Sequence, residues 1–329
     1  MTEDLIRVEN LTMHFPLQKG FMANLFTREK KFVRAVDGVS FAIRKGEVLG
    51  LVGESGSGKT TTGRLILRLL KQTSGEVFYR SKSITAYSSG EMECLREKMQ
   101  VIFQDPYASL SPRMSIGDAI SHPLRIHGVA DGTKARELTL AMMEKVGLSP
   151  ASFLYRKYPH QVSGGQRQRV VIARALVTNP DFVVADEPIA MADVSVRSMI
   201  LELMVKLKEE FDLTYLFITH DLATCKYICD HLAIMYLGKI VEIGPLQEIF
   251  RNPVHPYTAT LLDAVPVPDP KFRRTHPMPK GEIPSPINPP SGCSFHPRCA
   301  YAEPACSLTV PELVDVGMEH RVACPVKAR

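Results

Sequence analysis

The stretch GESGSGKTT, residues 53–61, constrains the fold of this chain more than any other feature, because it matches the pattern G-x-x-x-x-G-K-[ST]. It follows EVLGLVG, which predicts a strand, and it opens KTTTGRLILRLL, which predicts a helix. A glycine-rich turn between a strand and a helix lets backbone N–H groups approach an anion, and the helix N-terminus adds partial positive charge. The stretch therefore predicts an α/β core with a phosphate-binding loop.

Individual side chains of this loop have distinct expected roles. Gly56 and Gly58 leave room for phosphate oxygens close to the backbone. Lys59 places a positive charge on the β- and γ-phosphates of a nucleotide, and the Thr60 hydroxyl can ligate Mg²⁺. The candidate nucleotide-binding residues of the loop are Gly53, Ser55, Gly56, Ser57, Gly58, Lys59, Thr60 and Thr61.

Two apolar runs, FVVADEP and TYLFITHD, end in polar residues, which is typical of buried parallel strands whose C-terminal ends carry chemistry. The first run places Asp186 and Glu187 side by side. Asp186 is the candidate for holding Mg²⁺ and its water shell. Glu187 is then the candidate general base that accepts a proton from the attacking water.

The stretch VSGGQRQRVVIARAL predicts a second anion-binding helix N-terminus, in which Ser163 caps the helix and two glycines open it. One ATP does not need two such sites from one chain. We therefore expect this site to serve an ATP that is held mainly by another subunit. Its candidate residues are Ser163, Gly164, Gly165 and Gln166.

Taken together, GESGSGKTT, FQDP, SGGQRQR, VVADEP and ITHD resemble, in order and spacing, the nucleotide-binding subunits of ABC transporters over about residues 1–265. NPVHPYTATLLDAVP followed by GCSFHPRC resembles the C-terminal extension of the oligopeptide/dipeptide permease ATPase subunits. This resemblance implies an ABC-type P-loop core with an antiparallel β subdomain and a helical subdomain at about residues 105–160. A small irregular extension would follow over residues 266–329, where the sequence becomes rich in proline and glycine.

The resemblance also implies roles for residues outside the three motifs. Gln104 would sense the γ-phosphate and contribute to the Mg²⁺ site with Thr60 and Asp186, and His220 would contact the γ-phosphate. Phe15 would stack on adenine, with Phe32 as the alternative and core packing as a third interpretation. The segment PIAMAD retains Asp193, which usually lies near the partner's nucleotide, but departs from the family pattern P-x-S-A-L-D.

Four of the seven cysteines lie in the tail with the spacing C-x5-C-x6-C-x17-C, at Cys293, Cys299, Cys306 and Cys324. Four thiolates suit zinc or an iron–sulfur cluster equally well, and the resemblance favours a [4Fe–4S] cluster. Such a group would hold together a proline-rich segment that cannot easily bury a core alone. Conventional packing is the other interpretation, and it is the one expected for the remaining cysteines, Cys94, Cys225 and Cys229.

The function that the resemblance implies is an ATP-hydrolysing subunit that powers a membrane importer by ATP-driven dimer closure. The cargo would be di- or oligopeptides, with oligosaccharides or nickel as alternatives. The first residues lack a secretory signal, and no apolar run is long enough to span a bilayer. We therefore expect a peripheral protein on the cytoplasmic face of the plasma membrane.

The resemblance implies several partners, namely a second ATPase subunit (itself or a paralogue), two transmembrane permease subunits and, indirectly, an extracytoplasmic substrate-binding protein. The alternative function is a soluble, non-transport ABC ATPase that acts on a macromolecule. A nucleic-acid partner is not expected, because the net charge is only +5 and few aromatic residues accompany the basic residues of the tail.

Overall fold

The computed structural model describes residues 3–17, 31–265, 277 and 279–327. Part of the basic, irregular segment PLQKGFMANLFTREKKF, which predicts a loop, and the first residues of the proline-rich extension lie outside these ranges. The chain divides into two compact units. The first unit contains Met1–Leu5, Ile43–Val48 and Arg80–Ile218, and the second contains Ile6–Ala42, Leu49–Tyr79 and Thr219–Arg329.

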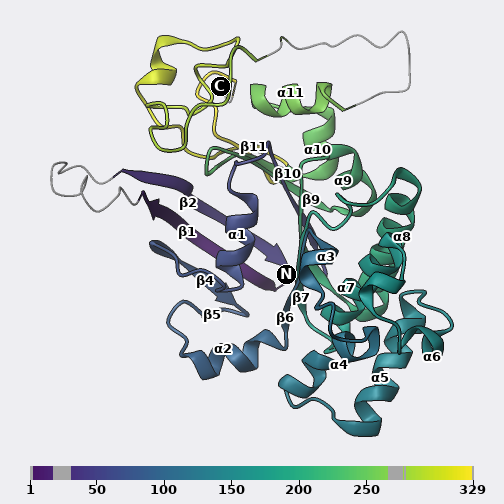
Figure 1. The fold of residues 1–329 in the computed structure, drawn as a ribbon. Helices are drawn as coiled ribbons and strands as arrows, with labels where there is room; N and C mark the ends of the chain where they lie inside the picture. Colours follow the sequence, from purple (N-terminus) through teal and green to yellow (C-terminus); the bar gives the residue numbers. More distant parts are fainter. Residues whose placement is uncertain (1–2, 18–30, 266–276, 278, 328–329) are drawn as a thin grey trace, which may run out of the picture. The chain divides into compact units, whose positions relative to one another are not determined.

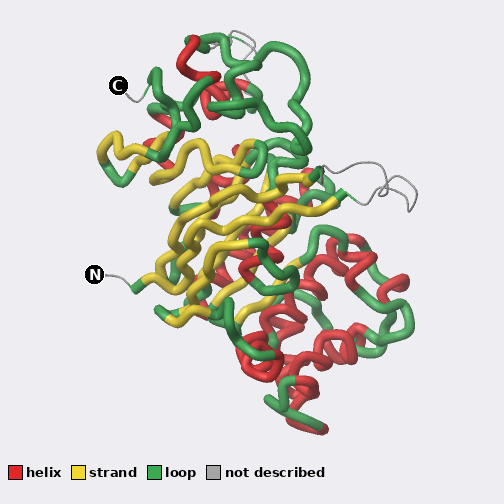
Figure 2. Tube along the Cα trace, turned by 90° about the vertical axis from the view of Figure 1, so that its left-hand side faces the viewer, coloured by secondary structure: helices red, strands yellow, loops and turns green. Residues whose placement is uncertain are grey.

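An antiparallel sheet lies largely in the second unit and carries strands β2 (Phe32–Arg44), β1 (Asp4–Pro16) and β4 (Ser74–Tyr79), in that order. Strand β1 pairs with β4 so that Ile6 lies opposite Tyr79. Alternate apolar side chains along these strands are buried, among them Val8 and Val36. These strands are among the segments coloured yellow in Figure 2, and they form the antiparallel β subdomain that the resemblance implies.

The phosphate loop of the second unit joins β3 (Val48–Val52), which is buried throughout, to α1 (Lys59–Ile66). The helix ends earlier than the sequence predicts, because Arg68 adopts a left-handed backbone conformation with φ +49°. Strand β3 runs parallel to β9 (His231–Tyr236), and β9 pairs antiparallel with β10 (Lys239–Pro245). Helices α9 (Leu222–Ile228), α10 (Leu246–Arg251) and α11 (Pro256–Asp263) complete this part of the chain.

The C-terminal extension is mostly irregular, as expected, but its last part forms two strands. Strand β12 (His320–Val322) pairs antiparallel with β10, and β11 (Val314–Gly317) pairs antiparallel with β12. A short 3-10 turn, η3 (Pro304–Ser307), precedes them. The extension therefore adds two strands to the sheet that contains β3, giving the order β11-β12-β10-β9-β3 within the second unit.

The first unit contains the parallel strands β8 (Thr214–Thr219), β7 (Phe182–Asp186) and β6 (Met99–Ile102), in that order, together with the short strand β5 (Lys82–Ser83). In the expected helical region, about residues 105–160, α4 (Ile116–Ile126) packs on α5 (Gly132–Lys145), and both pack on α7 (Gly164–Leu176), which follows that region (Figure 1). The segment VSVRSMILELMVKLKEEF, whose apolar residues recur at helical spacing, forms α8 (Val194–Phe211) and buries Ile200, Leu203 and Leu207 along one stripe. The helices of this unit are α2 (Ser89–Arg96), α3 (Pro106–Ser109), α4 (Ile116–Ile126), α5 (Gly132–Lys145), α6 (Ala151–Leu154), η2 (Pro159–Gln161), α7 (Gly164–Leu176) and α8 (Val194–Phe211).

Within the described residues, every helix is too short or too polar to cross a lipid bilayer.

Candidate nucleotide site

The phosphate loop has a backbone that only glycine can supply at two positions. A Cβ at Gly53 would lie 2.1 Å from the carbonyl oxygen of Met235, and one at Gly58 would lie 2.1 Å from that of Ala35. Gly58 also has φ +107°, a backbone conformation that residues other than glycine rarely adopt. Gly56 has φ +78°, and a Cβ there would point into open space. The loop is therefore tightly fixed at both ends and open between them.

The polar groups of the loop suit an anionic ligand. The Ser57 side chain is buried, and its Oγ has no hydrogen-bond partner among the described residues. The buried Lys59 Nζ donates to the carbonyl oxygens of Gly53 at 2.7 Å and Glu54 at 3.0 Å. Helix α1 begins at Lys59 without an acidic residue in its first turn, so its positive end is not neutralised locally. A buried hydroxyl, an ammonium group and a helix N-terminus together fit the oxygens of a triphosphate.

Ser55 is exposed on this loop, and Thr60 and Thr61 are half-buried in the first turn of α1. The loop residues named from the sequence therefore share one strand–loop–helix segment of the second unit.

The two adjacent carboxylates lie at the end of β7 in the first unit. Asp186 is buried as the last residue of the strand. Glu187 has φ +46°, a left-handed conformation that costs a non-glycine residue about 1 kcal/mol or more. Its backbone N–H donates to the carbonyl oxygen of Ile218 at 2.9 Å. The amide Nε2 of Gln104 donates to Glu187 Oε2 at 3.1 Å, so the structure brings together two residues that the sequence named separately.

The second anion-binding helix begins with a capping box. Ser163 Oγ accepts a hydrogen bond from the Gln166 N–H at 3.2 Å, and Gln166 Oε1 accepts one from the Ser163 N–H at 3.0 Å. Ser163 and Gly164 are exposed, and a Cβ at Gly164 would meet open space. A Cβ at Gly165 would lie 3.1 Å from Val196 Cγ1. The start of α7 is therefore ordered by its own cap and remains accessible.

The remaining predicted residues lie at the ends of elements. Phe15 is half-buried near the end of β1, and Phe32 is 37% exposed at the start of β2. Asp193 is the N-cap residue of α8, but its side chain makes no capping hydrogen bond. Met191 in the same altered segment is 64% exposed. His220 is exposed directly after β8.

The four tail cysteines lie around one small pocket, next to Phe295 and His296. Burial, with smaller contributions from the other three thiols, raises the pKa of Cys293 to about 11. Burial also raises the pKa of Cys299. Across the described part of the chain, however, no group of three or more His, Cys, Asp or Glu side chains is arranged to hold a metal ion. The thiols therefore share a pocket, and the predicted iron–sulfur or zinc site stays a prediction.

Of the other cysteines, two pack conventionally and one does not. Cys225 and Cys229 are buried, and a Cβ added at Gly50 would lie 3.6 and 2.9 Å from their Sγ atoms. Cys94, which was expected to pack in the same way, is exposed. The sequence could not distinguish them, because the helix α2 that carries Cys94 buries a different side.

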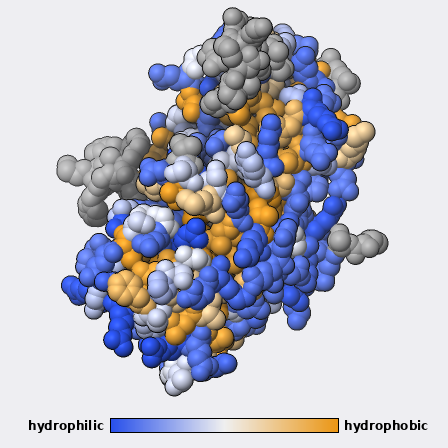
Figure 3. All heavy atoms as spheres, turned by 90° about the vertical axis from the view of Figure 1, so that its right-hand side faces the viewer, coloured by the Kyte–Doolittle hydropathy of each residue, from blue (hydrophilic) through white to orange (hydrophobic). Residues whose placement is uncertain are grey.

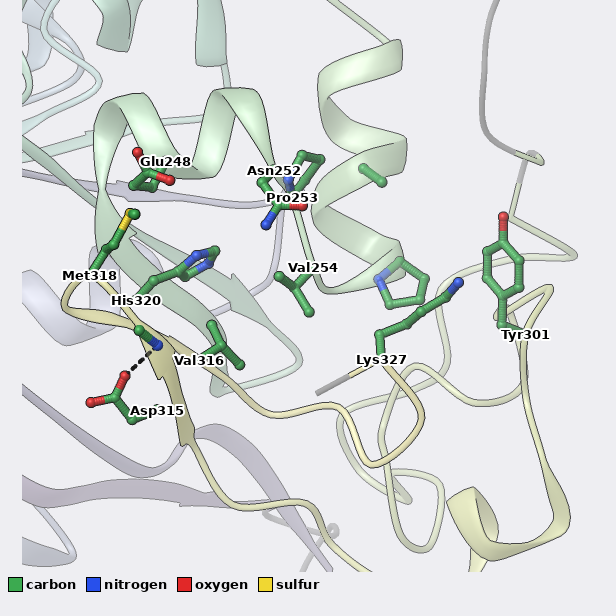
Figure 4. Close-up of a pocket in the computed structure, with 13 residues that line it drawn as sticks. Glu248, Asn252, Pro253, Val254, Tyr301, Asp315, Val316, Met318, His320 and Lys327 are labelled. Carbon is green, nitrogen blue, oxygen red and sulfur yellow. Dashed lines mark hydrogen bonds between the residues drawn. The ribbon is translucent and has the colours of Figure 1, made fainter. Parts of the chain in front are cut away.

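A pocket of about 720 Å³ lies between α10, the start of α11 and the β11–β12 hairpin (Figure 4). Two polar side chains of its lining, Asp315 and His320, are engaged within the protein. Asp315 Oδ1 accepts from the Gly317 N–H at 2.7 Å, and His320 Nε2 lies 2.7 Å from Oε1 of the fully buried Glu242. Glu242 also accepts from the N–H groups of Val254 at 2.8 Å and His255 at 3.0 Å. This arrangement joins the extension to β10 and offers nothing comparable to the phosphate loop.

The glycine-rich phosphate loop, the carboxylates at the end of β7 and the capped helix that SGGQ opens define an ABC-type ATPase. Residues 36–190 match the family model for ABC transporters, and residues 241–306 match that for the oligopeptide/dipeptide transporter C-terminal region. A dimeric ATP-binding cassette, solved in a post-hydrolysis state with ADP and Pi, superposes with a TM-score of 0.63 and 28% identity, covering 73% of this chain and 98% of that one. The predicted fold class is thereby confirmed.

Curated proteins match over almost the whole chain. The putative oligopeptide transport ATP-binding protein YkfD of Bacillus subtilis is 47% identical over 97% of this chain and 94% of its own length. The oligopeptide transport ATP-binding protein AppF of the same organism is 44% identical over 98% of this chain and 97% of its own length. The chain belongs to the ABC transporter family, in the group whose members carry the oligopeptide/dipeptide transporter C-terminal region.

Proposed function

We propose that this chain is the ATP-hydrolysing subunit of a membrane importer for di- or oligopeptides. The observation that carries the ATPase assignment is the phosphate loop, which combines the buried Ser57 hydroxyl and the Lys59 ammonium group with an open backbone position at Gly56. The peptide cargo is supported by the names of the relatives and by the matched C-terminal region. Oligosaccharides or nickel are the alternative cargoes.

In this proposal, the loop residues from Gly53 to Thr61 bind the triphosphate, and Thr60, Gln104 and Asp186 serve the Mg²⁺ ion. Glu187 accepts the proton of the attacking water. Its contact with Gln104 at 3.1 Å supports a shared role, because one amide then orients the base. The exposed His220 contacts the γ-phosphate, and Phe15 stacks on adenine.

The accessible start of α7 supports a role across a dimer. The capping box leaves the space beside Gly164 open. A phosphate group of the ATP bound to a second subunit could therefore approach the backbone N–H groups there. We assign Ser163, Gly164, Gly165 and Gln166 to the ATP of the partner, together with Asp193. ATP binding then closes a pair of such subunits, either identical or paralogous, and hydrolysis reopens it.

Docking on two permease subunits would place this chain at the cytoplasmic face of the plasma membrane. Several large apolar side chains of the helical region are exposed, most of all Tyr107 at 63%, Phe153 at 61% and Ile126 at 55%. Apolar residues also reach the molecular surface in the view of Figure 3. Exposed apolar groups of this size suit a protein partner. The extracytoplasmic substrate-binding protein would act through the permease subunits.

We also propose that the four tail cysteines bind a [4Fe–4S] cluster, with zinc as the alternative. Their shared pocket and the chemistry of four thiols support a common ligand. Bound as thiolates, they would stabilise residues 266–329, which we treat as a separate extension of the nucleotide-binding domain, residues 1–265.

Uptake measurements in the host cell test the importer assignment. Deleting the gene should abolish uptake of labelled di- or oligopeptides, and the intact chain should restore uptake while the Lys59→Ala chain should not. Normal peptide uptake by the deletion strain would exclude the peptide assignment, and screening oligosaccharides and nickel in the same strain would then identify the alternative.

A further inference from the structure

The C-terminal extension reaches the phosphate loop through one buried arginine. Arg298 lies 8% exposed in the extension, and its guanidinium binds the Glu54 carboxylate of the loop in a bidentate manner. Nη1 donates to Glu54 Oε2 at 2.8 Å, and Nη2 donates to Oε1 at 3.2 Å. The two residues are 244 positions apart in the sequence. Paired hydrogen bonds between a guanidinium and a carboxylate fix direction as well as distance.

Aromatic side chains hold this arginine in place. Phe295 is buried, and its ring centroid lies 5.3 Å from that of Tyr236 and 5.4 Å from that of Tyr257. The Arg298 guanidinium lies 5.8 Å from the centroid of Tyr236 and 5.9 Å from that of Phe295. Nη1 also donates to the Tyr236 hydroxyl at 3.4 Å. The hydrogen bonds with Glu54, more than the opposing effect of burial, raise the pKa of Arg298, which keeps it charged.

Glu54 is restrained at three separate groups. Arg298 holds its carboxylate, and the backbone N–H donates to the Tyr257 hydroxyl at 2.9 Å. Its carbonyl oxygen accepts from Lys59 Nζ at 3.0 Å. Because Lys59 is the cation assigned to the phosphates, the position of Glu54 bears on the position of that ammonium group. The extension therefore contacts the residue on which the geometry of the loop depends.

We infer that Arg298 is a positioning residue for nucleotide binding, through which the C-terminal extension sets the conformation of the phosphate loop. This inference rests on the proposed nucleotide site. Arg298 does not touch the nucleotide in this account, and it acts through Glu54. Losing the bidentate pair leaves either the half-buried Glu54 carboxylate or the buried Arg298 guanidinium without its main partner, and the loop then relaxes away from the conformation that binds phosphate.

A double-mutant cycle on the full-length chain tests the inference. The variants are Arg298→Met, Glu54→Gln and the two combined, and the readout is the dissociation constant for a fluorescent ATP analogue with Mg²⁺. Each single variant should weaken binding about tenfold, as expected for a charged hydrogen bond. The combined variant should be no weaker than either, because both changes remove the same interaction. Arg298→Lys should bind the ATP analogue with intermediate affinity, because lysine retains the positive charge but cannot form the bidentate pair.

Two controls separate positioning from folding and from the site itself. Arg321→Met changes an exposed arginine of the same extension and should leave affinity unchanged. Thermal unfolding without nucleotide shows whether each variant is folded, and if Arg298→Met is not, then Glu54→Gln decides alone. Lys59→Ala should abolish binding. If it does not, the proposed nucleotide site is wrong.

The inference is overturned if Lys59→Ala no longer binds the ATP analogue while Arg298→Met and Glu54→Gln bind it with normal affinity. It is equally overturned if the two losses are additive in the combined variant, because Arg298 would then not act through Glu54.

Discussion

Glu187 carries the largest local departure from ordinary backbone geometry among the proposed catalytic groups. Its φ of +46° is unfavourable for a side chain with a Cβ, and the N–H bond to Ile218 and the amide of Gln104 hold it there. Strained backbone persists where surrounding contacts determine it, which is common at functional sites. The sequence predicted the residue and its partner separately, because each lies in its own short motif, but the backbone conformation has no sequence pattern.

Lys59 gives the first prediction at the residue scale. Lys59→Ala removes the ammonium group and its bonds to the carbonyl oxygens of Gly53 and Glu54. We expect ATP hydrolysis to fall about a hundredfold or more, because charge on the β- and γ-phosphates is no longer neutralised. Release of inorganic phosphate measures the loss. Lys71→Ala, an exposed lysine of the same unit, is the matched control and should hydrolyse ATP normally. Unchanged turnover in Lys59→Ala would mean that the loop is not the active site.

At the scale of elements, the parts that carry motifs were predictable and the parts that support them were not. β3, α1, β7 and α8 follow from local apolar patterns and from the loop between them. The β11–β12 hairpin was not predicted, because its strands are only four and three residues long and the pairing of β12 with β10 joins segments that lie far apart in the sequence. The contact of Arg298 with Glu54 likewise depends on tertiary structure alone.

The start of α11 gives a prediction of pH dependence. His255 is buried, and its Nδ1 accepts from the Tyr257 N–H at 3.1 Å, so the neutral ring caps the helix. Burial lowers the pKa of His255 from 6.5 to about 4, against the opposing effect of Glu242. Between pH 6.5 and about pH 4, His255 binds a proton in the unfolded chain but not in the folded chain. The free energy of unfolding therefore falls as the pH falls through this window, by up to about 3 kcal/mol.

Denaturant unfolding of the intact chain and of His255→Asn between pH 7 and pH 4 measures this contribution. Asparagine can still accept the capping bond but does not titrate. The variant should lose less stability on acidification than the intact chain. Parallel pH profiles for the two proteins would show that His255 does not contribute.

At the scale of the whole molecule, the proposed functional groups are divided between the two units. The phosphate loop and His220 belong to the second unit, and Gln104, Asp186, Glu187 and the start of α7 belong to the first. The extension belongs to the second unit, where it contacts the loop through Arg298. Integrity of the extension should therefore affect nucleotide binding as well as local stability.

The tail cysteines supply the prediction for the extension. Protein purified without oxygen should contain about four iron and four sulfide per chain and absorb near ~400 nm. Cys299→Ser should lose iron and make residues 279–327 more susceptible to proteolysis, because one ligand is removed. Cys94→Ser, at an exposed cysteine of the first unit, should retain its iron and its resistance to proteolysis. Stoichiometric zinc without iron would contradict the cluster and support the alternative.

In the proposed mechanism, ATP closes a dimer and hydrolysis, with Glu187 as the general base, reopens it. Glu187→Gln keeps the size of the side chain but removes its basicity, so hydrolysis should fall by about two to four orders of magnitude while ATP binding survives. The closed state then has no exit through hydrolysis. Gly164→Asp, added to the same chain, puts a carboxylate at the open side of α7 and should repel the triphosphate of the partner.

Size-exclusion chromatography with Mg·ATP, on each variant alone and with its partner ATPase, is the most direct measurement. We expect Glu187→Gln to form an ATP-dependent dimer that dissociates when Gly164→Asp is added. A monomer under every condition, with Glu187→Gln still hydrolysing ATP at the normal rate, would contradict both the general base and the dimer mechanism.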